Sequence, residues 1–476
     1  MTMAEDRRHV VFVSQHYPPD KGGNATRIHD LATYLVDHGW QVTVLAPPAS
    51  FPPGEFDRSW QHRRTESVDG VMIHRLWTWQ PQTENPGMRH RLAYYLLFGI
   101  HAMVWLLWSI RRYDAVVTTT PPISTGAPGL LARLLGKPWV VDVRDRWIDA
   151  SVSLGYLEEG SRIERISRRF QRLVLHTADR ISVTTPQLEM AIRESYGNSL
   201  GEKTTLLPNG VDVKRFQAHR NQTEYSPTER NQTGKNHVES NQTRRNHTER
   251  EQDRELYAVK GGSGAGTPEP ADGGERVPSV ESGAKADGGG ETIIYTGNLG
   301  SAQDLESVIR AMSHLSHDGA SLQLVGGGDV ESELRQLTDE LGIGDTVEFA
   351  GVVRREEVPT FLDQATVGIA PLKDTDELAY AIPTKVYEYM ASCLPTVVTG
   401  CGEIERFVDE SGGGVHVAND PEQIAQQLDE LLEDDTRRQQ LAERGREYVE
   451  TNYDRKAIAR HLGDELAQLV EDERAR

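Results

Sequence analysis

Short apolar runs alternate with helical patterns along the first part of the chain. The first repeat of this pattern is an apolar run, a turn-rich segment HYPPDKGG, and then apolar residues at helical spacing before the next apolar run. Such β-α-β units favour a parallel sheet covered by helices, and they predict one doubly wound domain over residues 1–216. Its predicted strands lie at residues 10–14, 40–45, 71–75, 115–118, 139–143, 180–183 and 204–207.

The alternation stops over residues 217–290, where a polar ten-residue unit occurs three times before a segment rich in Gly, Ser, Pro and Glu. This composition cannot bury enough apolar surface to offset chain entropy, so we expect a disordered linker. Four Asn-x-Thr sequons lie in it, and we expect them to stay unmodified in a cytosolic chain. The sequons are Asn221, Asn231, Asn241 and Asn246.

Residues 291–433 return to the same alternation, with the runs TIIYT, LQLV, VEFAG, VGIAP and TVVT as predicted strands. They predict a second doubly wound domain. Residues 434–476 predict a long helix that packs back on the first domain. The expected fold class is therefore α/β, with two Rossmann-like domains facing each other across a cleft and a disordered insertion between them.

The charge balance narrows the class of protein. Asp and Glu total 72 against 52 Lys and Arg, and the formal net charge of −20 argues against a nucleic-acid partner. Such acidity resembles cytosolic proteins of salt-adapted cells, in which concentrated salt screens the repulsion between carboxylates. The chain has two cysteines, Cys393 and Cys401, and its N-terminus shows no signal-peptide pattern, so we expect a reducing, cytoplasmic location.

Residues 92–110, LAYYLLFGIHAMVWLLWSI, contain no formal charge and are flanked by arginines on both sides. Their length permits a membrane span, but a span inside one sheet would place successive strands on opposite sides of the membrane. A helix lying in the membrane interface fits the flanking arginines and the aromatic residues better, and an ordinary buried helix is the alternative. The interfacial helix predicts peripheral attachment at the inner face of the cell membrane.

Candidate ligand loops follow several predicted strands, where open α/β sheets bind their ligands. Gly22 and Gly23 open the first helix, and the segments TGNLG (296–300) and VGGGD (325–329) follow strands of the second domain. Backbone N–H groups in such loops approach anions closely. The chain lacks a GxGxxG fingerprint after its first strand and a GxxxxGK[ST] loop, which disfavours a nicotinamide dehydrogenase and a P-loop nucleotide hydrolase.

The segment AIPTKVYEYMASCLPTVVT places a lysine where a helix normally disfavours one. With Pro383 at the first helical position, Lys385 lies in the first turn, where its charge opposes the helix dipole. Helical spacing puts Lys385, Glu388 and Tyr389 on the polar side of this helix. A positive helix end with an added ammonium suits a phosphate, whereas the alternative is an ordinary solvated charged face.

The sequence resembles the retaining family-4 glycosyltransferases of GT-B fold, in the branch that builds cell-surface polysaccharides or lipid-linked glycans. The resemblance rests on SQHYPPDKGGNATRIHDLATYL, VVDVRDRWIDASVSLG, LLPNGVDVKRF, YTGNLGSAQDLESVI, LVGGGDVESELRQL and IPTKVYEYMASCLPTVV. It covers nearly the whole chain except residues 217–290. It implies a nucleotide-sugar donor, here expected to be UDP-linked, a lipid-linked or glycan acceptor on the first domain, and no metal or other cofactor.

The resemblance also assigns roles to residues. Glu388 matches the second glutamate of the E-x7-E motif, which holds the donor ribose. Lys385 would neutralise the diphosphate, and Gly22 and Gly23 match the phosphate and acceptor loop. Asp145 is a candidate for orienting the acceptor hydroxyl, with Asp142 and Asp149 as alternatives. The remaining donor-binding candidates are Gly297, Asn298, Gly300, Gly326, Gly328 and Pro383.

The chain departs from the family pattern at two places. Tyr380 stands where the first motif glutamate is expected, and residues 301–304 replace the usual Arg and Lys pair. The alternatives are a nucleotide-sugar 2-epimerase of the same fold and a non-catalytic protein that binds a nucleotide-sugar. The DTD sequence at 374–376 matches a metal-binding D-x-D pattern, but it lies in a loop of the wrong architecture, so we expect no metal site there.

Overall fold

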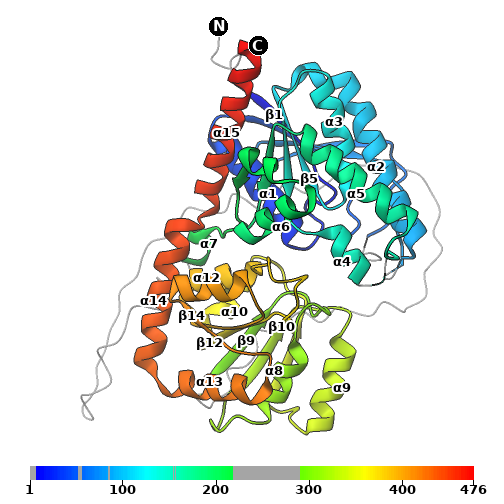
Figure 1. Cartoon of the computed structure of the whole chain (residues 1–476). Helices are drawn as coiled ribbons and strands as arrows, with labels where there is room; N and C mark the ends of the chain where they lie inside the picture. Colours follow the sequence, from blue (N-terminus) through cyan, green and yellow to red (C-terminus); the bar gives the residue numbers. More distant parts are fainter. Residues whose placement is uncertain (1–6, 52–55, 84–85, 154, 156, 218–289) are drawn as a thin grey trace, which may run out of the picture. The chain divides into compact units, whose positions relative to one another are not determined.

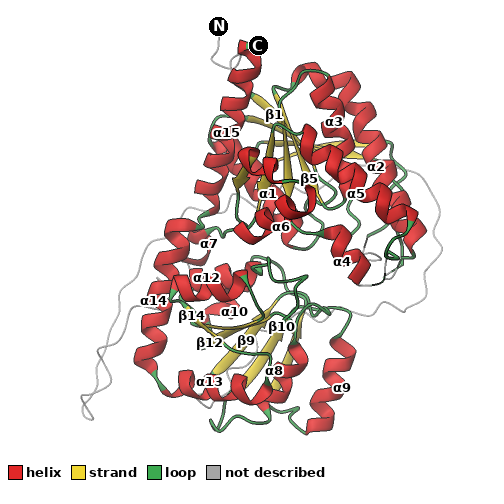
Figure 2. Ribbon diagram, in the orientation of Figure 1, coloured by secondary structure: helices red, strands yellow, loops and turns green. Residues whose placement is uncertain are grey.

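The computed structural model describes residues 7–51, 56–83, 86–153, 155, 157–217 and 290–476. The predicted disordered linker, apart from its end residues 217 and 290, lies outside the described residues, and so do the four sequons. The described chain contains two sheets, each flanked by helices (Figures 1 and 2). The prediction of two doubly wound α/β domains is confirmed.

The first sheet has eight strands in the order β3-β4-β2-β1-β5-β6-β7-β8. All neighbouring pairs are parallel except β3 and β4, which form an antiparallel hairpin at one edge. The strands are β1 His9–Val13, β2 Gln41–Ala46, β3 Arg63–Val68, β4 Val71–Leu76, β5 Ala115–Thr120, β6 Trp139–Val143, β7 Arg180–Val183 and β8 Thr204–Leu206.

Strand β3 is the only strand of this sheet, among the described residues, that the hydrophobic pattern did not predict. Its sequence RRTESV is polar and mostly exposed, because an edge strand paired on one side buries little side-chain surface. Charged residues on such an edge oppose pairing with another chain. A strand of this kind therefore leaves little hydrophobic signal in the sequence.

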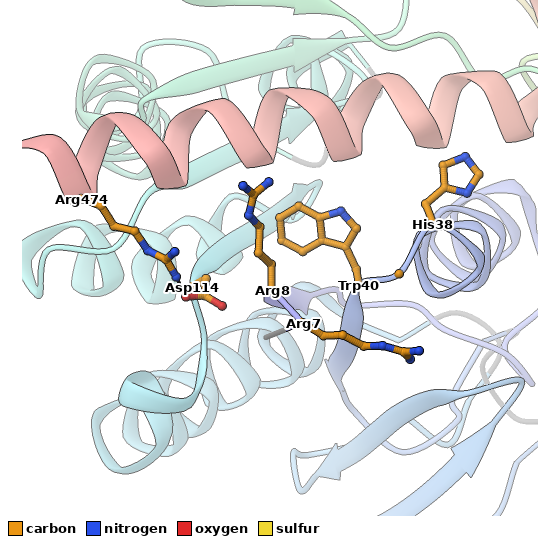
Figure 3. A pocket seen from close by; sticks show the side chains of 7 residues that line it. Arg7, Arg8, His38, Trp40, Asp114 and Arg474 are labelled. Atoms are coloured by element: carbon orange, nitrogen blue, oxygen red, sulfur yellow. Dashed lines mark hydrogen bonds and ion pairs between the residues drawn. The ribbon is translucent and has the colours of Figure 1, made fainter. Parts of the chain in front are cut away.

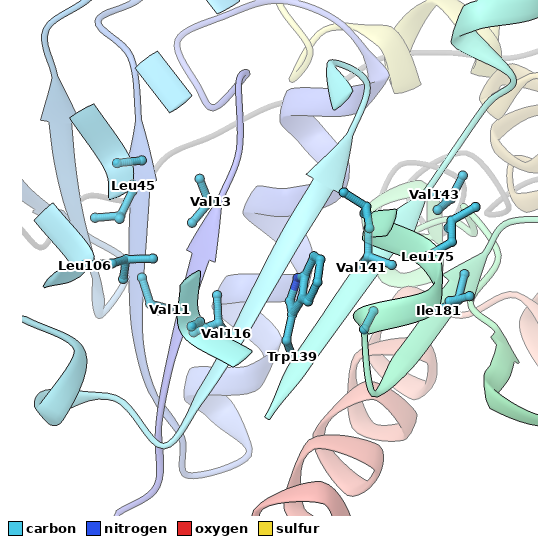
Figure 4. Packing of buried hydrophobic residues seen from close by; sticks show 14 of the residues in the cluster. Val11, Val13, Leu45, Leu106, Val116, Trp139, Val141, Val143, Leu175 and Ile181 are labelled. Atoms are coloured by element: carbon cyan, nitrogen blue, oxygen red, sulfur yellow. The ribbon is translucent and has the colours of Figure 1, made fainter. Parts of the chain in front are cut away.

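Alternate residues of β1 face two separate cores. Val11 and Val13 pack with Leu106 of α2, Trp139 of β6 and Leu175 of α5 (Figure 4). The opposite face carries α1 and α15, which lie side by side in Figure 1. The helical segments of this domain are α1 Gly23–Asp37, α2 Met88–Ser109, η1 Ile110–Arg112, η2 Ile123–Thr125, α3 Gly126–Leu134, α4 Trp147–Ser153, α5 Arg162–Thr177, α6 Pro186–Tyr196, η3 Asn198–Lys203 and α7 Val213–Gln217.

The second sheet has six parallel strands in the order β11-β10-β9-β12-β13-β14. The strands are β9 Thr292–Thr296, β10 Ser321–Val325, β11 Val347–Gly351, β12 Val367–Pro371, β13 Thr396–Thr399 and β14 Gly414–His416. Its helices are α8 Leu305–Met312, α9 Glu331–Leu341, α10 Val358–Asp363, α11 Thr384–Ala391, α12 Glu403–Ser411 and α13 Pro421–Glu433. Strand order reverses beside β9, so β9 and β12 flank the switch point where open sheets bind ligands.

The predicted long C-terminal helix consists of two helices, α14 Asp435–Asn452 and α15 Arg455–Ala475. Helix α14 packs against α11, while α15 packs against α1 of the first domain. The chain breaks between them at Asp454, whose side chain accepts a hydrogen bond from the N–H of Lys456 and caps α15. Helical periodicity alone did not reveal this break.

Helix α2 covers the segment predicted to meet a membrane. Residues 89–112 are long and apolar enough to cross a membrane by length and composition, and 39% of their most apolar 18-residue stretch is buried inside the protein. Phe98, Ala102 and Leu106 are fully buried against the sheet, while Ile100, Leu107 and Trp108 are exposed. One side of the helix therefore belongs to the core of the first domain, and the other side is an exposed apolar surface.

Candidate functional site

A cavity of about 490 Å³ lies at the carboxyl edge of the second sheet and includes the loop before α1 of the first domain. It brings together most of the donor and phosphate candidates predicted from the sequence. Those that line it are Gly22, Gly23, Gly297, Asn298, Gly300, Pro383, Lys385 and Glu388. The other lining residues are Thr296, Ser301, Ala302, Gln303, Asp329, Val358 and Thr384.

The loops after β9 and β10 need glycine for two different reasons. Gly297 has φ +122, a conformation that favours glycine, and its amide donates to the carbonyl of Val325 at 2.8 Å. A Cβ at Gly326 would lie 1.9 Å from the carbonyl oxygen of Gly297, and a Cβ at Gly328 would lie 2.3 Å from that of Leu299. Gly326 and Gly328 are not among the cavity-lining residues; they allow the two loops to pack closely behind it.

Helix α11 begins one residue later than predicted. Pro383 is the N-cap, with φ −59 and ψ 135, and the helix itself starts at Thr384. Pro383, Thr384 and Lys385 line the cavity, so the N-terminal end of α11, where the first amides lack partners within the helix, lies at its wall. The side chain of Thr384 lies 3.8 Å from where a Cβ on Gly23 would be, which places the helix tip beside the loop that opens α1.

Lys385 is 8% exposed, and its ammonium lies against neutral groups of the second domain. Nζ donates to Oε1 of Gln303 at 3.0 Å and lies 3.6 Å from the ring centroid of Tyr295. Burial lowers the pKa of Lys385 well below its ordinary value, and Glu388 opposes this shift. An anion in the cavity would supply the negative charge that the amide and the ring cannot supply.

Tyr389 was predicted on the polar side of α11, and this assignment is wrong. The residue is fully buried, and its hydroxyl oxygen accepts a hydrogen bond from the N–H of Thr296 at 2.7 Å. This contact ties α11 to the end of β9, directly before Gly297. The helical pattern could not show that Tyr389 is buried, because a tyrosine has both an apolar ring and a polar hydroxyl and therefore occurs on either side of a helix.

Glu388 lies near three arginines that sequence reasoning missed. Burial raises its pKa, while Arg455, Arg355 and Arg215 act in the opposite direction. Arg355 and Arg455 also pair with Asp30 of α1, Arg355 at 3.1 Å. The arginines come from α7, the loop after β11 and the start of α15, so no local spacing in the sequence could have grouped them.

The structure separates the three aspartates that the sequence left open. Asp142 is buried and pairs with Arg27 at 3.1 Å, and Asp149 pairs with Arg146 at 2.9 Å and with Arg168 at 2.8 Å. Asp145 differs, since its Oδ1 is buried and has no hydrogen-bond partner among the described residues. Burial raises its pKa to about 6, although Arg144 and the N–H of Trp147 lower it.

Asp145 does not line the cavity that holds Lys385, but the loop carrying Tyr380 links the two regions. The hydroxyl oxygen of Tyr380 accepts a hydrogen bond from the N–H of Arg146 at 3.1 Å, and its carbonyl accepts one from Oγ1 of Thr185 at 2.8 Å. Tyr380, which replaces the first motif glutamate, is thus buried against the first domain and lies just ahead of α11 in sequence.

A second hollow, of about 520 Å³, lies at the amino ends of the strands of the first sheet (Figure 3). Two of its three arginines are paired with carboxylates: Arg474 pairs with Asp114 at 3.0 Å, and Arg8 pairs with Glu471 of α15 at 2.5 Å. Ligands of open α/β sheets bind at the opposite, carboxyl edge. The cavity at Lys385 is therefore the better candidate site.

Among the described residues, no group of three or more His, Cys, Asp or Glu side chains is placed to hold a metal ion. The described residues include the DTD sequence at 374–376.

Two family models match the chain. The model described as "Glycosyl transferase 4-like domain" matches residues 22–210, and the one described as "Glycosyl transferases group 1" matches residues 281–448. Together they cover both domains. The Escherichia coli (strain K12) protein WcaI, named as a colanic acid biosynthesis glycosyl transferase, is 21% identical over 96% of this chain and 99% of its own length.

Solved structures share the fold. Sucrose-phosphate synthase from Thermosynechococcus elongatus has a TM-score of 0.67 at 19% identity, covering 98% of this chain and 100% of that one. HepE from Anabaena, in complex with UDP-glucose, has a TM-score of 0.59 at 13% identity, covering 97% of this chain and 99% of that one.

Both halves of the chain thus match glycosyltransferase models, WcaI is similar over nearly the whole chain, and the fold is that of solved GT-B glycosyltransferases. The chain belongs to the group 1, family-4 glycosyltransferases.

Proposed function

We propose that the protein transfers a sugar from a nucleotide-sugar, expected to be UDP-linked, to a lipid-linked or surface-glycan acceptor, with retention of the anomeric configuration. The observation that carries this proposal is Lys385, a buried ammonium at a helix tip on the wall of the cavity. A helix N-terminus and an ammonium together suit a diphosphate. The similarity to HepE, solved with UDP-glucose, and to WcaI, named for colanic acid biosynthesis, supports this substrate class.

In this proposal the donor lies in the cavity with its diphosphate at the tip of α11. Lys385 and the backbone around Gly297 and Gly300 meet the diphosphate, and Glu388 accepts hydrogen bonds from the ribose. The arginines near Glu388 favour its ionised form, which is the form that only accepts hydrogen bonds. Gln303 and the ring of Tyr295 hold the Lys385 ammonium in place before the donor arrives.

The reaction breaks the bond between the anomeric carbon and the diphosphate oxygen, and the departing diphosphate keeps both electrons. The acceptor oxygen forms the new bond on the same face of the sugar, and its proton passes to the departing phosphate oxygen. Lys385 contributes most where negative charge increases on the leaving group, and each well-placed donor of this kind is worth about 3 kcal/mol. Asp145 accepts a hydrogen bond from the acceptor hydroxyl and orients it.

Replacement of the ammonium tests the proposal. Lys385→Met retains much of the side-chain volume and removes the charge, so kcat should fall about 100-fold while UDP affinity falls much less. Lys203→Met is the matched control, because the ammonium of Lys203 donates to the carbonyls of His176 and Ala178 in the first domain, at 2.7 and 2.8 Å. The control should retain kcat.

The assay mixes a panel of radiolabelled nucleotide-sugars with a membrane lipid extract in concentrated salt and separates lipid-linked, glycan-linked and free sugar. Transfer that survives in Lys385→Met would remove this residue from its role. Conversion of the donor to its 2-epimer without an acceptor would indicate the epimerase of the same fold. Tight UDP binding without any turnover would indicate a binding protein.

A further inference from the structure

Helices α2, α3 and α5 form one layer on the first sheet. Each of them leads into one of three neighbouring parallel strands, β5, β6 and β7, so the three helices run side by side in the same direction. Helix α3 contacts both of the others, and a Cβ on Gly126 of α3 would lie 2.6 Å from a methyl group of Val174 on α5. Figure 1 shows these helices on one side of the first sheet.

Large apolar side chains are exposed to solvent on the outer side of this layer. Six of these side chains lie on α2, two at the end of α3 and three on α5. Together they are most of the exposed large apolar side chains in the described part of the chain. Trp108 is 86% exposed and Leu134 is 82% exposed, so these side chains are not ordinary half-covered core residues. The full set is Leu96, Leu97, Ile100, Val104, Leu107, Trp108, Leu134, Leu135, Ile163, Ile166 and Leu173.

The charge of the layer is opposite to that of the whole chain. The net charge of the protein is −20, yet α2 and α3 contain no carboxylate, and α5 contains one. That carboxylate, Glu164, is buried and bound to the N–H of Gly160 and to Arg168. Helix α5 contributes five arginines, and α2 has arginines at both of its ends. The arginines of α5 are Arg162, Arg165, Arg168, Arg169 and Arg172.

We propose that the outer side of α2, α3 and α5 docks on an anionic phospholipid bilayer. Exposed leucine, isoleucine and tryptophan side chains enter the interface, and the arginines meet lipid phosphates around them. This inference deepens the proposed function, because a lipid-linked acceptor has to be reached at a bilayer. It extends the docking surface from the single helix predicted at residues 92–110 to a layer of three helices.

The same structure argues against α2 as a membrane span. Phe98, Ala102 and Leu106 are fully buried and belong to the core under the sheet, so withdrawing α2 into a bilayer would expose that core. A helix lying along the interface keeps these contacts and inserts only its outer side, about 5–10 Å deep. The ring of Tyr95 on α2 lies 6.5 Å from that of Trp147, two residues after Asp145, so the docked helix contacts the acceptor region.

Vesicle flotation tests the proposal with the full-length protein. Vesicles of phosphatidylcholine, with and without about 30 mol% phosphatidylglycerol as the anionic lipid, are mixed with the protein. The salt concentration is raised in steps from the lowest at which the protein stays folded up to about molar salt. The wild type should float with the anionic vesicles. Its partition should weaken as the Debye length shrinks from about 10 Å to about 3 Å, leaving the contribution of apolar insertion.

Two double variants separate the two contributions. Arg165→Gln with Arg169→Gln should lower partition about 25-fold at low salt, at roughly fivefold for each arginine, and much less at molar salt. Leu107→Ser with Trp108→Ser should lower it about 10-fold or more at every salt concentration. The matched controls are Arg310→Gln with Arg335→Gln on the second domain, and Met190→Ser on α6, where Met190 is 50% exposed.

Several results would overturn the proposal. Absence of wild-type flotation, or equal losses in the controls, would show that this layer does not dock on lipid. Sedimentation velocity that finds a dimer disrupted by the Leu107→Ser and Trp108→Ser pair would assign the surface to a second copy of the chain. UDP binding is measured in every variant: retained binding with lost flotation separates a failure of docking from a failure of the proposed enzyme function.

Discussion

Replacing Asp145 by asparagine should stabilise the protein and at the same time impair transfer. Burial raises the pKa of this carboxyl group from its ordinary 3.8 to about 6, so the folded state disfavours the ionised form. One pKa unit corresponds to about 1.36 kcal/mol, and the ionised carboxylate therefore costs about 3 kcal/mol at pH 7 relative to the unfolded chain. Asparagine keeps the shape and the contact with the Trp147 N–H, and it removes the buried charge.

The stabilisation should depend on pH in a defined direction. Because the pKa of Asp145 is raised on folding, its protonation favours the folded state below the ordinary value of 3.8, and this contribution is lost as the pH rises through about 6. The advantage of Asp145→Asn should thus be full at pH 7 and above and should vanish near pH 4. In a domain of this size, about 3 kcal/mol corresponds to a rise in Tm of about 6 °C or more.

The assay is a series of thermal melts of wild type and Asp145→Asn between pH 4 and pH 8 in constant high salt, together with transfer rates at each pH. Wild-type kcat/KM should fall below about pH 6, where Asp145 becomes protonated, and Asp145→Asn should lose about 100-fold in kcat. Asp149→Asn is the matched control: it breaks ion pairs with Arg146 and Arg168, so it should lower Tm modestly.

Two outcomes would refute this reasoning. A variant that is less stable than wild type by the same amount at pH 4 and pH 8 would show that the carboxylate at position 145 bears no burial cost. If Asp145→Asn is more stable than wild type but transfers sugar at an unchanged rate, the burial cost of the carboxylate is supported and the proposed role of Asp145 in orienting the acceptor is refuted. The two readouts therefore test the burial and the role separately.

Three further changes have defined outcomes. Asp142→Asn leaves the guanidinium of its partner buried without a counter-charge, so unfolding should become easier by about 3–5 kcal/mol, as seen by a lower Tm. Gly326→Ala places a Cβ 1.9 Å from a carbonyl oxygen of the neighbouring loop, at a residue whose φ of +142 favours glycine. The UDP affinity measured by calorimetry should therefore fall at least about 10-fold. Gly344→Ala is the control and should have no effect, because a Cβ there meets open space. Deletion of residues 221–288 should leave Tm and UDP affinity unchanged, because that composition cannot contribute to a packed core; loss of soluble protein would contradict this.

Much of the fold could be predicted from the sequence because buried parallel strands are continuous apolar runs. Residues 115–118 and 139–143 were assigned from such runs, and both lie in the middle of the first sheet. Strand β3 could not be assigned in this way, because its exposed polar residues follow no burial pattern. The break at Asp454 was missed for a related reason, since both flanking helices are polar on much of their surface.

The candidate site was predictable only where its chemistry is local. The glycine loops and Lys385 follow strands or open a helix, so their position in the sequence indicates where they lie. Gln303, Tyr295 and the arginines near Glu388 could not be found, because their grouping depends on how separate segments pack. Asp145 was distinguished from its neighbours by its own unpartnered Oδ1 and by the ion pairs that occupy Asp142 and Asp149, neither of which the sequence shows.

The position of Lys385 violates a local rule of helix formation, and the proposed function gives a reason for this violation. A lysine in the first turn of a helix opposes the dipole, and burial adds a second cost that lowers its pKa. The structure meets the ammonium with an amide oxygen and a ring face, which hold its position without neutralising its charge. In the proposed function a bound diphosphate would remove both costs at once, so the site would favour the charged leaving group over its own empty state.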